Sequence, residues 1–351
     1  MKTGSVNLPL HYGKAPPWLF KKMKRLARCI TVCIVEEEGA GRFLQKLSSP
    51  LWFQSLGCIL GFDWHSSGLT TVVCAALKEG IEGTENELGI FIAGGKGKKS
   101  RRTPTEIEEK AGAIDTVVEP LVYASRMSAK VDSAAVQDGY QIYQHTFFFT
   151  KKGEWAVVQQ GMNLKNRYAR RYHWLSGDID FVCEPHSGIS SQRLEDTVLN
   201  MVSGKSSDAR AKATEISKEK PDRITRQLLT LPRRHSILSA DINPKRLYKI
   251  FISTYERSPE NFEELIGIRG VGPKTIRALA LLSELLYGTP LDFTDPARFS
   301  YAHGGKDGHP YPVDRRGYEN TISIIERAIK SAKLGRRDEL EALKRLQRIM
   351  G

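Results

Sequence analysis

The run GVGPK at residues 270–274 combines residue types that can hold a phosphate group through the protein backbone. Glycine tolerates backbone angles that other residues resist, so the main chain of a Gly-Val-Gly turn can come close to an anion. Proline is favoured in the first turn of a helix, and the amides at a helix start carry partial positive charge. The candidate contact residues are Gly270, Val271, Gly272, Lys274, Thr275 and Arg277. Binding of nucleic-acid phosphates in this way does not depend on base sequence, and its affinity falls as the salt concentration rises.

The longer segment 265–279 resembles the helix-hairpin-helix motif, which binds the backbone of DNA. Leu265 and Ile268 would close the first helix, and Pro273 would open the second. Ile276 stands where the motif usually has alanine, so we expect the second helix to pack differently there. The alternative is a helical hairpin with a glycine turn and no ligand.

The same motif occurs in a superfamily of base-excision DNA glycosylases, whose members carry a catalytic aspartate downstream of it. Asp314, in the run PVDRR at 312–316, resembles that aspartate. About forty residues separate it from Gly272, roughly twice the spacing of that superfamily. Asp314 could equally be a charge at a helix N-terminus or one half of an ion pair. A glycosylase or lyase that uses Asp314 is therefore an alternative function.

A second group of residues could cleave a phosphodiester bond. A strand-like run at 143–149 carries His145, a turn follows at Gly153, and a second strand-like run leads to Asn163. This order resembles the active-site segment of phospholipase D-like nucleases, in which a strand histidine attacks phosphorus without a metal. Phe147 stands where that family has its phosphate-binding lysine. A phospholipase D-like domain with only one such segment usually needs a second copy to complete its active site, so this resemblance favours a homodimer.

Other side chains would have to supply the missing cation. The candidate catalytic residues are His145, His173 and Glu154, and the candidate DNA contacts of this region are Lys96, Lys98, Lys99, Arg170 and Arg171. Three of those lysines lie in the glycine-rich run 94–103, which lacks the spacing of an ATP-binding P-loop. An alternative uses Asp138, Glu154 and Asp178 or Asp180 to bind a divalent metal. No cofactor is identified by the sequence.

The surrounding pattern predicts two domains. Strand-like and helical runs alternate over residues 1–200, which predicts an α/β domain. Residues 201–235 are rich in Ser, Lys, Arg, Asp and Glu, and we expect a charged linker or a solvated helix. Residues 236–351 have helical periodicity throughout and would form an all-α, helix-hairpin-helix domain.

The bulk composition favours a polyanionic partner. The 351 residues contain 53 Lys and Arg against 40 Asp and Glu, a net charge of +13. The five cysteines form no CxxC pair, which argues against a disulfide framework and a structural zinc site. No apolar run is long enough to span a bilayer, and no secretion signal is recognisable. We expect a cytoplasmic, nucleoid-associated protein with no membrane contact.

Several long segments are similar to one uncharacterised prokaryotic family, the domain-of-unknown-function 763 proteins. These segments are LPLHYGKAPPWLF, WFQSLGCILGFDWHSSG, FIAGGKGKKSRRTP, VVQQGMN, ARRYHW and EPHSGI. The resemblance implies an intracellular archaeal or thermophilic protein and carries no activity with it. From the residues we expect a DNA-processing nuclease that holds DNA through residues 270–274. The alternatives are a base-excision enzyme and a DNA-binding module without catalysis.

Overall fold

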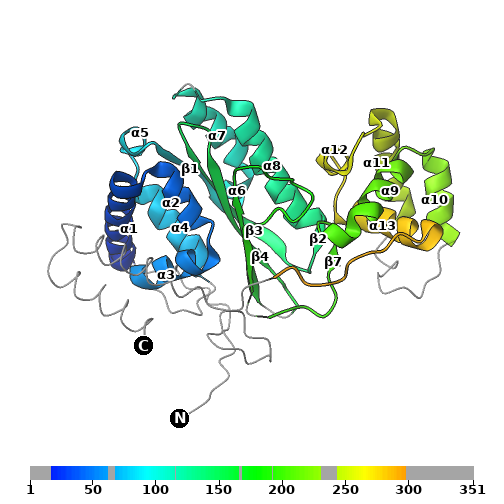
Figure 1. Ribbon diagram of the computed structural model, residues 1–351, viewed down its shortest axis with the longest axis horizontal. Helices are drawn as coiled ribbons and strands as arrows, with labels where there is room; N and C mark the ends of the chain where they lie inside the picture. Colours follow the sequence, from blue (N-terminus) through cyan, green and yellow to red (C-terminus); the bar gives the residue numbers. More distant parts are fainter. Residues whose placement is uncertain are drawn as a thin grey trace, which may run out of the picture.

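The computed structural model describes residues 17–61, 68–114, 116–165, 168–191, 193–230 and 243–297 (Figure 1). At its centre is a five-stranded sheet with the strand order β1-β3-β4-β5-β6, in which all neighbours are antiparallel. The strands are β1 (Ile90–Lys96), β3 (Gln141–Thr150), β4 (Trp155–Met162), β5 (Ala169–Leu175) and β6 (Gly188–Ser191). The first part of the chain is therefore a mixed helix-and-sheet structure, but the sheet is not the parallel kind typical of α/β folds.

The hairpin of β3 and β4 forms where the sequence predicts it. Phe149 pairs with Trp155, and Gly153 in the turn has a φ of +81°, a conformation that glycine adopts at little cost. The apolar runs in both strands are buried on both faces, because helices cover the sheet from either side.

Four helices cover one face of the sheet. They are α1 (Pro17–Glu38), α2 (Ala40–Leu47), α3 (Pro50–Leu60) and α4 (Leu69–Gly80). Their apolar side chains form one core with Phe148, Ala156 and Val158, which alternate with residues that point to the other face. Ser49 caps α3 by accepting a hydrogen bond from the Trp52 amide, as Ser commonly does before a first-turn proline.

The opposite face is covered by α7 (Thr103–Gly112) and α8 (Val118–Ala134), after the short helices α5 (Glu85–Leu88) and α6 (Lys98–Arg101). Phe147, Phe149 and Val157 point to this side. Beyond α8, the short strand β2 (Val136–Gln137) pairs with β7 (Leu199–Asn200) and leads toward the C-terminal helices (Figure 1).

The C-terminal helices share one continuous core with the α8 face of the sheet. They are α9 (Ser207–Ser217), α10 (Pro221–Thr230), α11 (Pro244–Arg257), α12 (Phe262–Gly267) and α13 (Pro273–Tyr287), preceded by a 3₁₀ turn at Gly204–Ser206. The described residues from 203 to 297 contain helices and no strand. None of the helices in the described ranges is both long and apolar enough to cross a membrane.

The segment expected to be a linker or a solvated helix is instead two packed helices, α9 and α10. On α9, Ala209, Ala213 and Ile216 are buried at positions i, i+4 and i+7, which lie on one helix face. This face packs against α13. The stripe is narrow and made mainly of alanine, so the charged residues around it dominate the composition. Residues 231–235, the end of that segment, lie outside the described residues.

Candidate nucleic-acid interface

The hairpin between α12 and α13 contains a type II β-turn. The Val271 amide donates to the Ile268 carbonyl at 3.2 Å, and Gly270, the third residue of the turn, has a φ of +96°. A side chain at that position would be strained, which explains the glycine. Val271 is buried, whereas Gly270 is exposed at the tip. The turn therefore presents its backbone to the surface, while its two large apolar side chains, Ile268 and Val271, are buried and anchor it.

Helix α13 begins directly after this turn. Gly272 is its N-cap residue with extended backbone, and Pro273 is the first helical residue. The amides of Thr275 and Ile276 both donate to the Gly272 carbonyl at 3.0 Å. The amide of Lys274 precedes these bonds and lies at the start of a 15-residue helix, where the partial positive charge of the helix is concentrated.

The side chains of the hairpin divide into exposed charges and buried anchors. Arg269 and Lys274 are exposed beside the turn. Thr275, one of the candidate contact residues, is 1% exposed, so its side chain does not fit a direct phosphate contact. Ile276 is fully buried in the core, so the helix accommodates the larger residue at the position where the motif has alanine.

The hairpin is fastened to the end of α8 and to β2. Lys130 donates from Nζ to the Ile268 carbonyl at 3.2 Å, and the Gln137 side-chain amide donates to the Pro273 carbonyl at 2.8 Å. Arg277 donates from Nε to Gln137 Oε1 at 2.8 Å. Arg277 therefore helps to hold the turn in place, a role that the sequence did not indicate.

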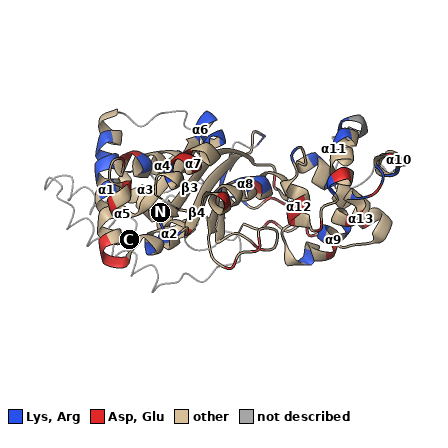
Figure 2. Cartoon of the chain, turned by 90° about the horizontal axis from the view of Figure 1, so that it is seen from above, with Lys and Arg blue, Asp and Glu red and all other residues tan. Residues whose placement is uncertain are grey.

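A second basic surface lies at the end of β1. Its exposed residues are Lys96, Lys98, Lys99, Arg101 and Arg102. Figure 2 shows this concentration of Lys and Arg at α6. The Gly97 amide donates to the Tyr143 carbonyl at 2.8 Å, and Lys96 Nζ lies 5.8 Å from the centre of the Tyr143 ring. The side chains of these lysines are therefore exposed to solvent.

His145 is buried, and both of its ring nitrogens are engaged. Nε2 lies 2.9 Å from Ser125 Oγ, and Nδ1 lies 2.8 Å from Gln159 Oε1. The Gln159 amide nitrogen donates to Asp132, so its oxygen accepts from His145 Nδ1, and Ser125 donates to Nε2. Burial lowers the pKa of His145. A nucleophilic attack on phosphorus would need an exposed ring nitrogen, which this packing does not offer.

His173 lies on the opposite face of the sheet from His145. Their strand partners on β4 are Val158 and Gln159, adjacent residues whose side chains point to opposite faces. His173 accepts from Arg171 Nε at 2.8 Å, and its Nδ1 donates to the Leu47 carbonyl at 2.9 Å. Burial is the main reason that the pKa of His173 lies well below its usual value, and the positive charge of Arg171 is the second reason. The two candidate catalytic histidines therefore do not converge in one site, because the pleat of the sheet places them on opposite faces.

Arg170 and Arg171 are buried in the core. Arg170 lies between two carboxylates, with Nη1 3.0 Å from Asp138 Oδ2 and Nη2 2.6 Å from Asp295 Oδ2. Arg171 donates to Gln54 Oε1 at 3.0 Å and to the Pro50 carbonyl at 3.2 Å. Neither guanidinium reaches the surface, so the expected phosphate contact does not fit either arginine.

The acidic residues considered for metal binding do not converge. Glu154 is exposed at the β3–β4 turn and accepts from Thr150 Oγ1 at 3.1 Å, whereas Asp138 is buried beside Arg170. Asp178 and Asp180 are exposed in the loop after β5. No group of three or more His, Cys, Asp or Glu residues suited to a metal occurs within the described ranges. Asp314 lies outside the described residues.

A buried hydrogen-bond network around Asp132 was not predicted from the sequence. Asp132 accepts from Trp174 Nε1 at 3.0 Å and from the Gln159 side chain, and it lies 2.5 Å from His186 Nε2. The network joins α8, β4, β5 and the loop before β6, and through Gln159 it orients His145. Asp132 is fully buried, whereas the other charged residues of α8 (Glu119, Arg126 and Lys130) are not. The sequence of the helix does not distinguish Asp132 from them, so its role depends on the packing of α8 on the sheet.

The comparisons with known proteins identify a family but no activity. Neither the comparison with curated proteins nor that with solved structures gives a match. Residues 4–313 match the family model described as "Protein of unknown function (DUF763)", so the chain belongs to the DUF763 family.

Proposed function

We propose that the protein binds DNA through the backbone of the hairpin at residues 268–274. The observation that carries the proposal is the exposed type II turn leading into α13, with Arg269 and Lys274 beside it. A backbone amide at a helix start, next to two cations, matches the charge and size of a phosphate group. The net charge of +13 supports a polyanionic partner.

The fastening of the hairpin supports the same function. Contacts from Lys130 and Gln137 hold the turn before any ligand arrives, so little ordering entropy would be lost on binding. The exposed lysines of the α6 surface would add phosphate contacts elsewhere on the same DNA. The burial of His145 and His173 gives no support to phosphodiester cleavage at those residues, so we propose binding without assigning a reaction.

The test is duplex binding by the full chain at several salt concentrations, measured by fluorescence anisotropy. We expect Lys274→Glu to weaken binding to all sequences alike and to reduce the slope of log K against log salt by about 1. Lys152→Glu is the matched control, because Lys152 is exposed at the β3–β4 turn, away from the hairpin. Equal affinity of Lys274→Glu and the wild type would refute the proposal.

A further inference from the structure

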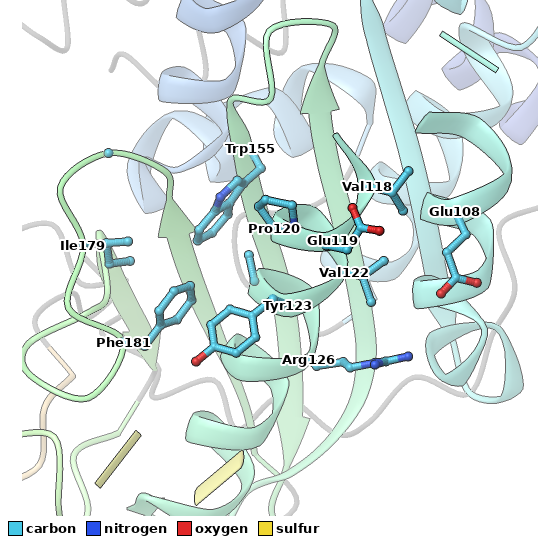
Figure 3. A pocket seen from close by; sticks show the side chains of 12 residues that line it. Glu108, Val118, Glu119, Pro120, Val122, Tyr123, Arg126, Trp155, Ile179 and Phe181 are labelled. Atoms are coloured by element: carbon cyan, nitrogen blue, oxygen red, sulfur yellow. The ribbon is translucent and has the colours of Figure 1, made fainter. Parts of the chain in front are cut away.

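A pocket of about 1050 Å³ lies over the first half of α8 (Figure 3). Its walls come from α7, α8, the start of β4 and the loop that follows β5. We propose that this pocket receives an unpaired base of the DNA that the hairpin holds. The inference rests on the proposed function and adds the kind of DNA that the protein prefers.

Three aromatic rings group together on one side of the pocket (Figure 3). Trp155 and Phe181 are nearly parallel, with ring centres 6.0 Å apart, and Tyr123 meets Phe181 edge-on at 5.7 Å. Tyr123 is 46% exposed although it is a large aromatic residue. Tyr123 is thus an exposed ring that packs against Phe181, which itself stacks on Trp155. Nucleobases stack on such supported rings whatever the base sequence.

The polar groups of the pocket suit the edge of a base better than a phosphate. Figure 3 shows Glu108 and Arg126 on the side away from the three rings, with Glu119 between them and Pro120. Carboxylates accept from the amino groups of bases, and a guanidinium donates to their ring nitrogens and carbonyl oxygens. The two carboxylates would repel a phosphate, so the DNA backbone would stay outside the pocket.

Helix α8 connects this pocket to the hairpin. Tyr123 donates from its hydroxyl to Glu263 of α12, and Lys130 donates to the Ile268 carbonyl in the turn. Tyr123 and Lys130 are separated by two turns of α8, which is about 10 Å along its axis. Successive phosphates of one strand are about 3.4 Å apart along a duplex, so the two features are about three nucleotides apart. A strand held at the hairpin can therefore place a nearby base in the pocket.

The two ends of α8 differ in charge in the way that a nucleotide requires, with the base at one end and the phosphate at the other. The pocket end carries Glu119, Arg126 and the exposed ring of Tyr123. The hairpin end carries Lys130, which donates to the Ile268 carbonyl next to the exposed Arg269. An organic cation is the other ligand that aromatic rings and carboxylates attract. The base is favoured because Arg126 lines the pocket and Arg269 and Lys274 are exposed at the nearby turn and helix start, and these three positive charges would repel a cation.

The test compares three DNA duplexes that share one sequence. One is fully paired, one carries a single-nucleotide bulge with a base, and one carries the same bulge as an abasic nucleotide. We expect the bulge with a base to bind about tenfold more tightly than the abasic bulge. This factor corresponds to the energy gained when one base stacks on an aromatic ring. Because the abasic bulge bends the DNA in the same way, the difference in affinity between the two bulged duplexes measures the contribution of the base itself.

Variants of Tyr123 separate stacking from the contact with α12. Tyr123→Ala should abolish the preference for the bulge with a base over the abasic bulge. Tyr123→Phe keeps the ring but loses the hydroxyl bond to Glu263, so it should retain the preference. Tyr255→Ala is the matched control, since Tyr255 of α11 is 44% exposed and lies outside the pocket.

Three outcomes would overturn the inference. They are equal affinity for the two bulges, loss of the preference in Tyr123→Phe, and binding of tetramethylammonium that depends on Tyr123 without any preference for the base. In each case, binding of paired duplex that Lys274→Glu weakens would leave the proposed function intact. Duplex binding that Lys274→Glu leaves unchanged would instead refute the proposed function. A failure of the inference and a failure of the proposed function are therefore distinguishable.

Discussion

Replacing Arg170 by Met tests whether this arginine is a structural ion partner or a DNA contact. Its guanidinium is fully buried between Asp138 and Asp295, whose side chains are 1% and 5% exposed. Asp138 also accepts from Tyr172 at 2.6 Å and from the Tyr140 amide at 3.0 Å. Methionine would fill much of the volume but would leave both carboxylates in the core without their cation.

The expected cost follows from that geometry. Removing one partner of a buried ion pair typically costs about 3–5 kcal/mol, because the remaining charge is left without compensation. Here two carboxylates share the lost partner, so we expect the upper part of that range. The measurement is urea unfolding of the full chain, with Arg101→Met as the control, since Arg101 is exposed on α6. The control should change the free energy of unfolding by less than about 0.5 kcal/mol.

The loss should depend on pH in a defined direction. Burial raises the pKa of Asp138 to about 6 even though Arg170 lowers it, so removal of Arg170 raises the pKa further. A carboxyl whose folded pKa lies above its unfolded value destabilises the fold at high pH, and this cost disappears as it becomes protonated. The variant should therefore lose more stability at pH 8 than at pH 5. Normal stability combined with loss of DNA binding would show that Arg170 faces DNA and that the reasoning is wrong.

Three further predictions concern the hairpin, α9 and the histidines. Gly270→Val should cost about 1–2 kcal/mol in thermal or urea unfolding, because valine must adopt the φ of +96°, and it should also weaken duplex binding; unchanged stability would argue against the type II turn. Ile216→Ala should cost about 2–4 kcal/mol, whereas a solvated helix would tolerate it. His145 and His173 should both titrate below 6.5 in NMR spectra. Their depressed folded pKa means that stability falls as the pH drops below 6.5, and a normal titration of either would contradict its burial.

The sequence by itself determined the features that depend on near neighbours in the chain. The hairpin turn, its glycine at positive φ and the start of α13 lie within a few residues of one another, so their residue types were enough. The same holds for the β3–β4 hairpin, whose turn and flanking apolar runs are contiguous. The side chain of Thr275 is an exception within the motif, because its burial depends on what packs against the helix.

Only the tertiary structure decided which polar residues meet. Arg170 and Asp295 are 125 positions apart, and a charged residue in the sequence looks the same whether it is buried with a partner or exposed. The strand register put His145 and His173 on opposite faces, because a side chain changes face at every position along a strand. The pocket beside Tyr123 likewise exists only because α7, α8, β4 and the loop after β5 converge. Local backbone preferences act over a few residues, whereas burial and ion pairing depend on which distant segments pack together.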